Sequence, residues 1–203
     1  MAEVECFFDC SSPWTYFAVH SLLELREEIG ATIAFRPHLV GGVFNAVNPS
    51  VHNAREKPVV PKAAYNKKDQ MDWASFLGIK MHYRPTVFPV NSVKVMRGCC
   101  WLEGTDKLEP FMMAAFDAYW GEDRDISKDD ALTEICHKAG VKPEDFFAAI
   151  NEQANKDRLR NNTDELIRRG GFGSPTMFVG GGDMYFGNDR MPLIKASVLR
   201  HRK

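Results

Sequence analysis

Ser12 lies at a junction between a short strand and a helix, and this junction is suited to holding an anion. Serine is a favourable N-cap, and Pro13 behind it is pre-set for the first helical position. Free amide N–H groups and the positive end of the helix dipole converge at such a position and stabilise negative charge. A thiolate carries such a charge, so the turn favours thiol chemistry. The simpler interpretation is that Ser12 only caps the helix.

Four residues at this turn exclude one kind of thiol chemistry. A C-x-x-C pair here would indicate a dithiol redox protein. The chain instead has Ser12-Pro13-Trp14-Thr15, with a hydroxyl at each end of the motif. Because a hydroxyl cannot form a disulfide, these two positions cannot exchange disulfides themselves. A thiol used at this turn would therefore come from a bound molecule.

The flanking residues predict the elements that position Ser12. Alternating apolar residues over 4–8 predict a strand. Apolar residues then recur at helical spacing from Trp14 to Ile29, and Gly30 ends the helix. The turn therefore connects a buried strand to the N-terminus of a long helix.

A proline near the other end of the chain marks the start of another strand. Pro175 stands directly before the apolar run 176–179 and belongs at the first residue of that strand, because proline is disfavoured inside a central strand. A cis peptide bond is possible there. A turn at 180–183, a short strand at 184–186 and a last helix opened by residues 187–190 follow. The two ends of the chain therefore read βαβ and αββα.

The residues between these two ends, from about 40 to 155, predict helices. Apolar spacing with Gly or Pro at the boundaries places these helices at 62–77, 91–101, 108–120, 127–139 and from Pro143 onward. Ser127 begins the fourth of them, and Asp130 follows three residues later as in a capping box. Since the αββα pattern resumes afterwards, the helices form an insertion within one domain.

The chain accordingly divides into a domain formed by residues 1–40 and 156–203 and an inserted helical subdomain formed by residues 41–155. Within the insertion, the segment 47–61 is rich in Asn and Pro and is the least regular. It is either a mobile lid over the cleft at Ser12 or a plain surface connection, and we prefer the connection.

Composition limits the class of protein. A chain of 203 residues can bury a core and carry an insertion, and its formal net charge of −1 argues against binding to nucleic acid. No signal peptide or membrane span is readable, and five cysteines without framework spacing suit a reducing compartment, where glutathione is abundant. The six histidines do not fall at metal-ligand spacings, so no metal is predicted. We expect a soluble, cytoplasmic protein.

Six short motifs occur in a fixed order over nearly the whole chain. They are Phe8-Asp9-x-x-Ser12-Pro13-x-x-Tyr16, Arg36-Pro37-x-Leu39-x-Gly41-Gly42, Phe88-Pro89-x-Asn91-Ser92, Tyr119-Trp120-x-Glu122-Asp123, Gly173-x-Pro175-Thr176-Met177-Phe178 and Phe186-Gly187-Asn188-Asp189-Arg190. Together they resemble the family of 2-hydroxychromene-2-carboxylate isomerases and kappa-class glutathione transferases, which is similar to the DsbA branch of the thioredoxin fold. The resemblance implies an α/β, thioredoxin-like fold with the all-helical insertion between the βαβ and αββα halves. It also implies a homodimer and glutathione as cofactor.

The resemblance implies an enzyme in which Ser12 is the catalytic residue. Only a few per cent of free glutathione is thiolate at neutral pH, because the pKa of a free thiol is about 8.5. A hydrogen bond from the Ser12 hydroxyl, together with the helix N-terminus, favours the ionised form. The thiolate then adds to an aromatic electrophile. In an isomerase the ring opens, a double bond rotates and glutathione is expelled, whereas in a kappa-class transferase the adduct leaves as product.

The resemblance also places glutathione against the C-terminal half of the chain. The backbone of Ser174, directly before Pro175, pairs with the cysteinyl part. The pocket for the γ-glutamyl end is formed by Phe186, Gly187, Asn188 and Asp189. Asp189 accepts the α-ammonium group, and amides at the start of the last helix favour the α-carboxylate. The simpler interpretation of Asn188 and Asp189 is a helix cap.

The acceptor side departs from part of the family pattern. The lysine and tyrosine that hold the aromatic acid in naphthalene-pathway isomerases align with Phe44 and Val90 here, whereas Arg36-Pro37 and Gly41-Gly42 are closer to the kappa transferases. The isomerase is our first hypothesis, and a kappa-class transferase or peroxidase is the alternative. We expect an acceptor cleft between the active turn and the insertion, where Phe44 and Phe88 select a flat aromatic electrophile over a small polar one.

Two hypotheses from other classes remain. A DsbA-like thiol-disulfide oxidoreductase would use Cys10, two residues before Ser12, although the hydroxyls of Ser12 and Thr15 argue against it. A non-catalytic interaction protein with a thioredoxin fold would not bind glutathione. The adjacent Cys99 and Cys100 lie in an apolar helix and are predicted to be inert core thiols.

Overall fold

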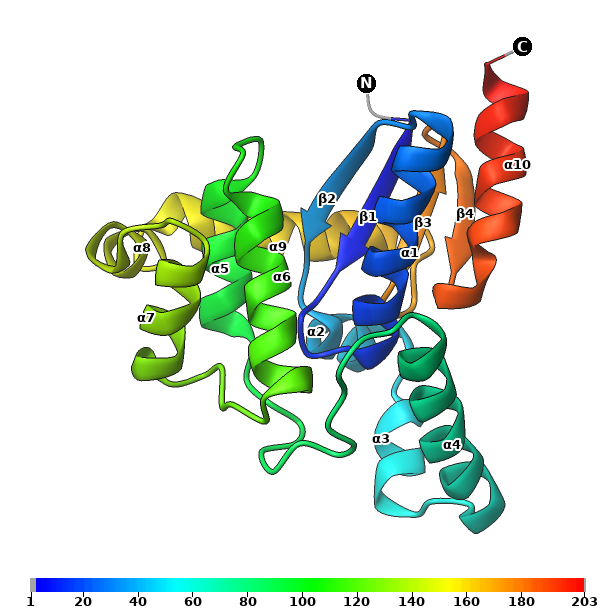
Figure 1. Cartoon of the computed structure of the whole chain (residues 1–203), viewed down its shortest axis with the longest axis horizontal. Coiled ribbons are helices and arrows are strands. Elements are labelled where there is room, and N and C mark those ends of the chain that lie inside the picture. The colour runs from blue at the N-terminus through cyan, green and yellow to red at the C-terminus, as the bar shows by residue number, and fades with distance from the viewer. Residues whose placement is uncertain (1–2, 203) are drawn as a thin grey trace.

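A four-stranded mixed sheet joins the two ends of the chain in the computed structural model, which describes residues 3–202 (Figure 1). The strands are β1 (Val4–Phe8), β2 (Ile33–Pro37), β3 (Thr176–Val179) and β4 (Asp183–Phe186). Their order is β2-β1-β3-β4, with β1 parallel to β2 and antiparallel to β3. Cys6 lies opposite Phe35 in one ladder and opposite Met177 in the other. The predicted βαβ and αββα segments therefore share one sheet.

Helices cover both faces of this sheet. They are α1 (Pro13–Ile29), α2 (Val40–Val47), α3 (Ser50–Glu56), α4 (Val60–Phe76), α5 (Val93–Leu102), α6 (Leu108–Phe116), α7 (Asp129–Lys138), α8 (Pro143–Ala149), α9 (Gln153–Arg168) and α10 (Met191–His201). Helices α1 and α10 pack together on one face, and α9 crosses the other face with α2 against it (Figure 1). Helices α5 to α8 gather beyond β2, and α3 and α4 project from the opposite side of α2.

Helix α1 begins and ends as its sequence predicts. Ser12 has an extended backbone (φ −101°, ψ 120°), and its Oγ accepts a hydrogen bond from the amide of Thr15 at 3.3 Å. Gly30 adopts a left-handed conformation (φ 62°), and its N–H donates to the carbonyl of Arg26 at 2.8 Å. Glycine adopts this conformation without a steric penalty, so it ends the helix cleanly.

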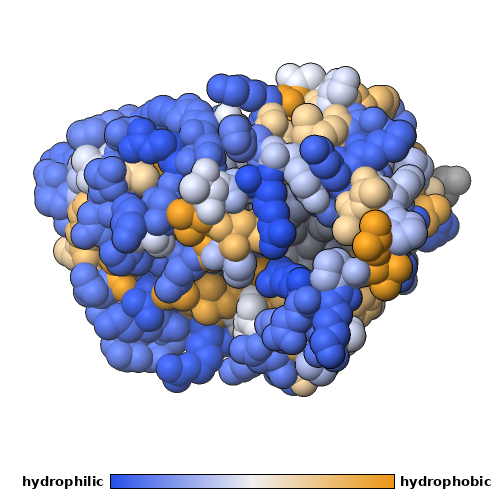
Figure 2. Space-filling view, turned by 90° about the horizontal axis from the view of Figure 1, so that it is seen from below, coloured by the Kyte–Doolittle hydropathy of each residue, from blue (hydrophilic) through white to orange (hydrophobic). Residues whose placement is uncertain are grey.

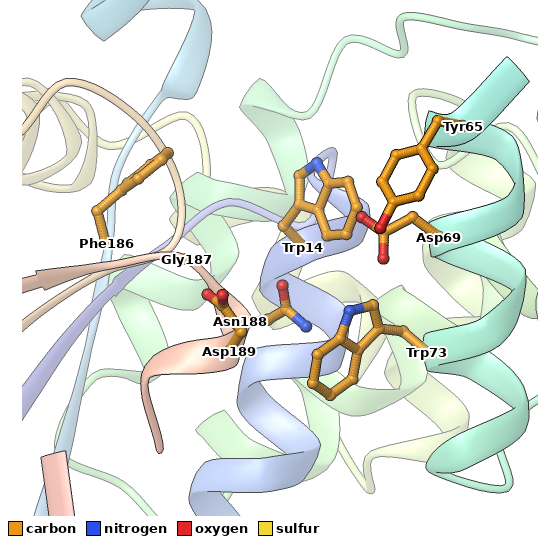
Figure 3. Close-up of a pocket in the computed structure, with 8 residues that line it drawn as sticks. All are labelled: Trp14, Tyr65, Asp69, Trp73, Phe186, Gly187, Asn188 and Asp189. Carbon is orange, nitrogen blue, oxygen red and sulfur yellow. The ribbon is translucent and has the colours of Figure 1, made fainter. Parts of the chain in front are cut away.

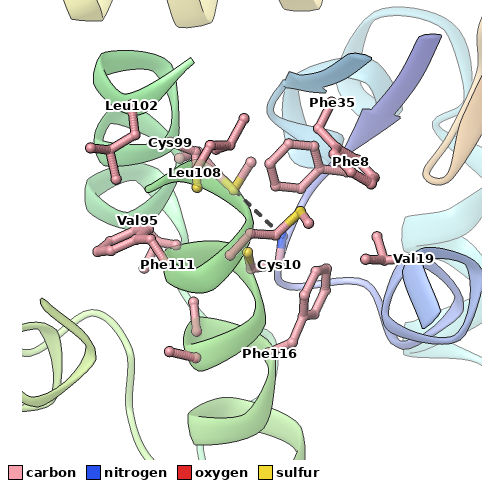
Figure 4. Packing of buried hydrophobic residues seen from close by; sticks show 14 of the residues in the cluster. Phe8, Cys10, Val19, Phe35, Val95, Cys99, Leu102, Leu108, Phe111 and Phe116 are labelled. Carbon is pink, nitrogen blue, oxygen red and sulfur yellow. Dashed lines mark hydrogen bonds between the residues drawn. The ribbon is translucent and has the colours of Figure 1, made fainter. Parts of the chain in front are cut away.

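The main hydrophobic core runs without interruption from the sheet into the insertion. Phe8, at the end of β1, and Cys10, in the turn that follows, pack in the same cluster as Cys99 from α5 and Phe116 from α6 (Figure 4). Cys99 and Cys100 are both fully buried, as predicted. The active turn therefore packs directly against the inserted helices, which hold it in place.

The segment 47–61 is more regular than its composition predicts, so the expectation that it is the least regular part of the insertion is wrong, whereas its role as a lid or as a surface connection stays a prediction. Ser50–Glu56 forms α3, and α4 already begins at Val60. Pro49 occupies the N-cap of α3, and Pro61 lies in the first turn of α4. Proline is tolerated at helix starts, so these prolines begin helices here instead of breaking them.

Two helix boundaries in the insertion also differ from the expectation. The α-helix expected to run to Trp120 ends at Phe116 and continues as a π-helix at Asp117–Gly121. Ser127 does not cap α7, which begins at Asp129, because its amide and hydroxyl both donate to Asp125 Oδ1, at 3.0 and 2.6 Å. Asp125 therefore competes successfully for the groups that a capping box would use.

Helix α9 begins in the predicted insertion and continues across residue 155 to Arg168. The division at 41–155 remains a prediction, as do the homodimer and the cytoplasmic location. Among residues 3–202, none of the helices combines the length and the apolar character that crossing a membrane requires.

Candidate active site

Ser12 and the Ser174-Pro175 pair meet at the N-terminus of α1, although 162 residues separate the two serines. The Ser12 hydroxyl donates to the carbonyl of Ser174 at 3.0 Å, and the Thr15 and Ser174 hydroxyls are 2.8 Å apart. The Ser174–Pro175 peptide bond is cis. Ser12 is largely buried, with 7% of its surface exposed. A thiolate bound here would compete with the Ser174 carbonyl for the proton of Ser12.

A buried carboxylate fixes the shape of this turn. Asp9 is 1% exposed and accepts hydrogen bonds of 2.9 Å from the amide and hydroxyl of Ser11 and from the amide of Val40. Burial raises the pKa of the Asp9 carboxyl, and these hydrogen bonds oppose the rise. Asp9 therefore ties the active turn to the start of α2.

The insertion holds the same turn through the backbone of Cys10. Trp120, in the π-helix, donates from Nε1 to the carbonyl of Cys10 at 3.0 Å, and the amide of Cys10 lies 3.5 Å from Met96 Sδ on α5. The Cys10 side chain itself is fully buried beside Cys99 (Figure 4). Burial, followed by a hydrogen bond with Cys10, raises the pKa of the Cys99 thiol well above its ordinary value. Such a thiol is a poor nucleophile, which argues against an oxidoreductase that uses this pair.

A pocket of about 460 Å³ opens beside the first turn of α1, where Trp14 lines it (Figure 3). It is lined by Trp14, Tyr65, Asp69, Trp73, Phe186, Gly187, Asn188 and Asp189. The last four were predicted from the sequence to bind glutathione. Helical periodicity assigned Trp14 to the packed face of α1, but its side chain is partly exposed at this pocket.

The α4 wall of the pocket was not predicted. Tyr65, Asp69 and Trp73 are each four residues apart, so they share one face of α4. This spacing was readable from the sequence, but nothing in the sequence indicated that the face would lie opposite residues 186–189.

The floor of the pocket holds an amide without a hydrogen-bond partner. Asn188 is 5% exposed, and its Nδ2 is buried and has no partner within residues 3–202. Gly187, directly before it, has φ 103° and donates to the carbonyl of Pro175 at 3.3 Å. Asp189 is about half exposed and lies 3.3 Å from the guanidinium of Arg190. A buried donor without a partner is costly, so Asn188 is suited to receiving an acceptor group from a ligand.

The predicted acceptor side gathers two arginines that the sequence analysis did not single out. The guanidinium of Arg84 lies 4.4 Å from the ring centroid of Phe88, and that of Arg55 lies 5.6 and 5.7 Å from the rings of Phe44 and Phe88. Within residues 3–202 neither arginine has a carboxylate at ion-pair distance. Burial, and next the charge of Arg84, lowers the pKa of Arg55. This pair of cations is therefore suited to an anionic aromatic ligand.

Phe88 connects this aromatic cluster to the active turn. Its ring meets that of Trp120 edge-on at 6.3 Å, and Trp120 in turn donates a hydrogen bond to the carbonyl of Cys10.

Viewed from the side of α3 and α4, the surface is hollowed near its centre, with strongly hydrophilic side chains on the rim (Figure 2). In the part of the chain that the structure describes, no group of three or more His, Cys, Asp or Glu side chains is placed to hold a metal ion.

Known proteins resemble this chain over nearly its whole length. The family model of the DSBA-like thioredoxin domain matches residues 3–198. A 2-hydroxychromene-2-carboxylate isomerase from Pseudomonas putida is 29% identical over 199 residues, covering 97% of this chain and 94% of that protein. Glutathione S-transferase kappa 1 from Homo sapiens is 25% identical over 206 residues, covering 94% and 88% of the two chains. A solved structure of 2-hydroxychromene-2-carboxylate isomerase superposes with a TM-score of 0.83 at 26% identity, covering 98% and 95%.

These matches confirm the resemblance that the six motifs indicate, and with it the thioredoxin-like fold. The relatives are named isomerases and transferases, which confirms the prediction of an enzyme. The chain belongs to the DSBA-like thioredoxin domain family.

Proposed function

We propose that this protein is a glutathione-dependent isomerase that resembles 2-hydroxychromene-2-carboxylate isomerase. The observation that carries the proposal is the meeting of the Ser12 hydroxyl, the N-terminus of α1 and the Ser174-Pro175 pair beside a pocket with a buried, unpartnered Asn188 amide. The first three groups suit a thiolate, and the amide suits the carboxylate of an amino acid. Glutathione carries both groups in one molecule.

In this proposal glutathione lies along the groove from the active turn to residues 186–189. Its sulfur meets the Ser12 hydroxyl, and its cysteinyl part contacts Ser174 and Pro175. The α-carboxylate of the γ-glutamyl end accepts from Asn188 Nδ2, and the α-ammonium group lies against Asp189. Phe186 and Gly187 complete this end of the site. The thiol proton leaves to solvent, and Ser12 remains an O–H donor that does not itself attack.

Glutathione is regenerated unchanged in the isomerase reaction. The thiolate forms a carbon–sulfur bond with an aromatic electrophile, and the electron pair displaced from that carbon lets the ring open. The addition turns the double bond at that carbon into a single bond, which rotates in the adduct. The carbon–sulfur bond then breaks, the double bond forms again and the thiolate is released. A kappa-class transferase shares the first step but releases the adduct, so both activities use the same residues of this chain.

Asp189→Asn should weaken glutathione binding about tenfold while the rate at saturating glutathione changes less than about twofold. The lost charge faces the γ-glutamyl end, which is remote from the reacting sulfur, so ground state and transition state lose the same interaction. Calorimetry gives the affinity, and steady-state kinetics give the saturated rate. Asp164→Asn, on the exposed side of α9, is the control. If affinity were unchanged and only the saturated rate fell, the assignment of the pocket would be wrong.

The acceptor should be a flat aromatic electrophile, with a carboxylate adding to its affinity. Arg55 and Arg84 face Phe88 without carboxylate partners among the described residues, and the name of the Pseudomonas putida relative specifies an aromatic carboxylate. We expect the double change Arg55→Gln and Arg84→Gln to raise KM about tenfold for a carboxylated aromatic acceptor and less than about twofold for its neutral analogue. Equal activity of the wild type toward aromatic and small polar acceptors would contradict this assignment.

A further inference from the structure

Arg84 and Phe88, which the proposed function places at the acceptor, lie on a connection without regular structure. Residues 77–92 link α4 to α5 and form neither a helix nor a strand. Such a segment has no ladder of hydrogen bonds of its own, so other parts of the chain must fix its side chains. The part that carries both residues, 82–88, is called the acceptor loop below.

Two anchors hold the acceptor loop on either side of Arg84. Before it, the amide of His82 donates to the carbonyl of Trp120 at 2.5 Å. After it, the amide and the hydroxyl of Thr86 donate to the two carboxylate oxygens of Asp123, each at 2.7 Å. Arg84 is therefore two residues from each anchor, and the second anchor depends on one side chain.

The Phe88 end of the loop has a separate anchor. The hydroxyl of Tyr119 donates to the carbonyl of Val87 at 2.9 Å, directly before Phe88. Loss of the Asp123 carboxylate would leave this bond in place. It would therefore release the backbone beside Arg84 more than the backbone beside Phe88.

The backbone of Asp123 is fixed in an uncommon conformation that directs its carboxylate to the loop. Among residues 3–202, Asp123 is the only residue other than glycine with a positive φ, at 56°. Aspartate adopts this region more readily than most residues, but it does so mainly where the surroundings require it. The hydrogen bonds from Thr86 lower the pKa of the Asp123 carboxyl, so it accepts them as a charged group. The carboxylate of the adjacent Glu122 instead pairs with Lys138, at 2.9 Å.

We infer that Asp123 is a positioning residue that holds Arg84 against Phe88 and so makes the acceptor site selective for an anionic aromatic ligand. The inference rests on the proposed function, in which Arg84 meets the carboxylate of the acceptor. Asp123 acts through Thr86 and the acceptor loop, and it contacts neither glutathione nor the acceptor. Its nearest cationic group is His82, whose Nε2 lies 3.7 Å from Oδ2, so it does not neutralise Arg84 by direct pairing.

Two substitutions of Asp123 separate its hydrogen bonds from its charge. Asp123→Gly removes both hydrogen bonds and keeps a residue that adopts φ 56° without strain. Asp123→Asn removes the charge but keeps an oxygen for the Thr86 amide and an NH₂ group for the Thr86 hydroxyl. Glu122→Gln is the control, because it removes a neighbouring carboxylate that does not contact the loop.

Binding of a flat aromatic acid and its neutral form gives the readout. The probes are naphthoate and naphthamide, and calorimetry measures the affinity of each for the protein loaded with glutathione. We expect Asp123→Gly to weaken naphthoate binding about fivefold and naphthamide binding less than about twofold. Asp123→Asn should restore most of the affinity for naphthoate, and Glu122→Gln should change neither affinity.

A second background shows whether Asp123 acts through Arg84. Arg84→Gln removes the guanidinium that the loop positions, so Asp123→Gly should then weaken naphthoate binding less than about twofold further. An independent effect of Asp123 would give the same loss in both backgrounds. Thermal melting of each variant establishes that the compared proteins are folded.

The outcomes separate the inference from the proposed function. Equal losses for the two probes, the same loss in the Arg84→Gln background, or no loss at all in Asp123→Gly would each overturn the positioning role. A loss in Asp123→Asn as large as that in Asp123→Gly would also overturn it, because charge and not the hydrogen bonds would then be responsible. These results leave the proposed function intact. If the wild type bound naphthoate no more tightly than naphthamide, the proposed acceptor and the inference would fall together, whereas glutathione binding is measured separately.

Discussion

Ser12→Ala should lower turnover at saturating glutathione by about 10- to 100-fold while glutathione affinity changes less than about threefold. The Ser12 hydroxyl lies at the N-terminus of α1 and now donates to the Ser174 carbonyl at 3.0 Å. When it donates to a thiolate instead, it makes a hydrogen bond to a charged group, which is worth about 1.5–3 kcal/mol. The peptide part of glutathione is held elsewhere, so binding depends little on this bond.

The pKa of the bound thiol gives a direct readout of this role. We expect the wild type to hold the glutathione thiol at a pKa below the free value of about 8.5, and Ser12→Ala to raise it by about 1 unit. Titration of the thiolate by its ultraviolet absorbance measures both values. Ser12→Thr, which keeps a hydroxyl and an N-cap side chain, should retain the lowered pKa.

Ser12 also caps α1, so the loss of the cap must be separated from the loss of the donor. Replacing an N-cap serine with alanine costs about 1 kcal/mol, whereas glycine costs only a few tenths. Ser12→Gly should therefore lose turnover like Ser12→Ala while melting close to the wild type. Unchanged turnover in either variant would remove Ser12 from the mechanism.

The parts of the fold that the sequence predicts well are those whose signals are local. Ser12 and Pro13 begin α1, Gly30 ends it, and Pro175 begins β3, each through its own backbone preference. Helix α3 carries no such clear signal along its length. Helix α3 buries no residue, so there is no apolar stripe for a periodic pattern to detect. Its helical state follows from neighbours that the sequence does not reveal.

The candidate site was predicted only where a family motif covers it. Residues 186–189 were found through the motif they form, but the α4 wall lies more than 100 residues earlier, and only the tertiary structure brings the two segments to one pocket. Arg55 and Arg84 were missed for the same reason, since they meet across Phe88 from two separate segments. Contacts between distant segments depend on packing, and one sequence carries no record of them.

The Arg36-Pro37 motif has a structural role. Arg36 aligned the chain with the kappa transferases, but its guanidinium Nη2 lies 2.9 Å from both Asn162 and Glu165 on α9. It therefore ties β2 to α9 on the face of the sheet opposite α1. A residue with this role supports the fold in either enzyme, so Arg36 does not decide between an isomerase and a transferase.

His38→Phe should remove a large part of the acid sensitivity of this protein. His38 follows β2, is fully buried and packs edge-on to Phe7 at 6.3 Å. Neither ring nitrogen makes a well-formed hydrogen bond to any residue in 3–202. Burial lowers the pKa of His38 from 6.5 to about 3, and the backbone of Phe8 opposes this change only in part. The sequence does not predict this burial, because a single buried imidazole leaves no local signal.

The sign of the effect follows from which state binds the proton. Below pH 6.5 the unfolded chain protonates His38, whereas the folded protein keeps it neutral down to about pH 3. The contribution of neutral His38 to the free energy of unfolding is therefore complete above pH 6.5. It is lost as the pH falls, at about 1.4 kcal/mol per pH unit, or about 3–5 kcal/mol between pH 6.5 and about pH 3. His20, whose pKa burial also lowers, adds to this loss, whereas Asp9, whose pKa is raised, opposes it at lower pH.

Urea unfolding between about pH 7 and pH 4.5 measures this slope. Asp9 and Glu103, whose pKa values burial raises, contribute to the slope of the wild type and of the variants alike, so the difference between the slopes isolates His38. We expect His38→Phe to reduce the slope by the equivalent of one proton, about 1.4 kcal/mol per pH unit, and the exposed control His137→Gln to leave it unchanged. The added volume of phenylalanine can lower stability at every pH, but that cost does not depend on pH and leaves the slope as the measure. The smaller variant His38→Leu should give the same slope. A slope equal to that of the wild type in both variants would mean that His38 takes up its proton in the folded protein, and burial would then not control its ionisation.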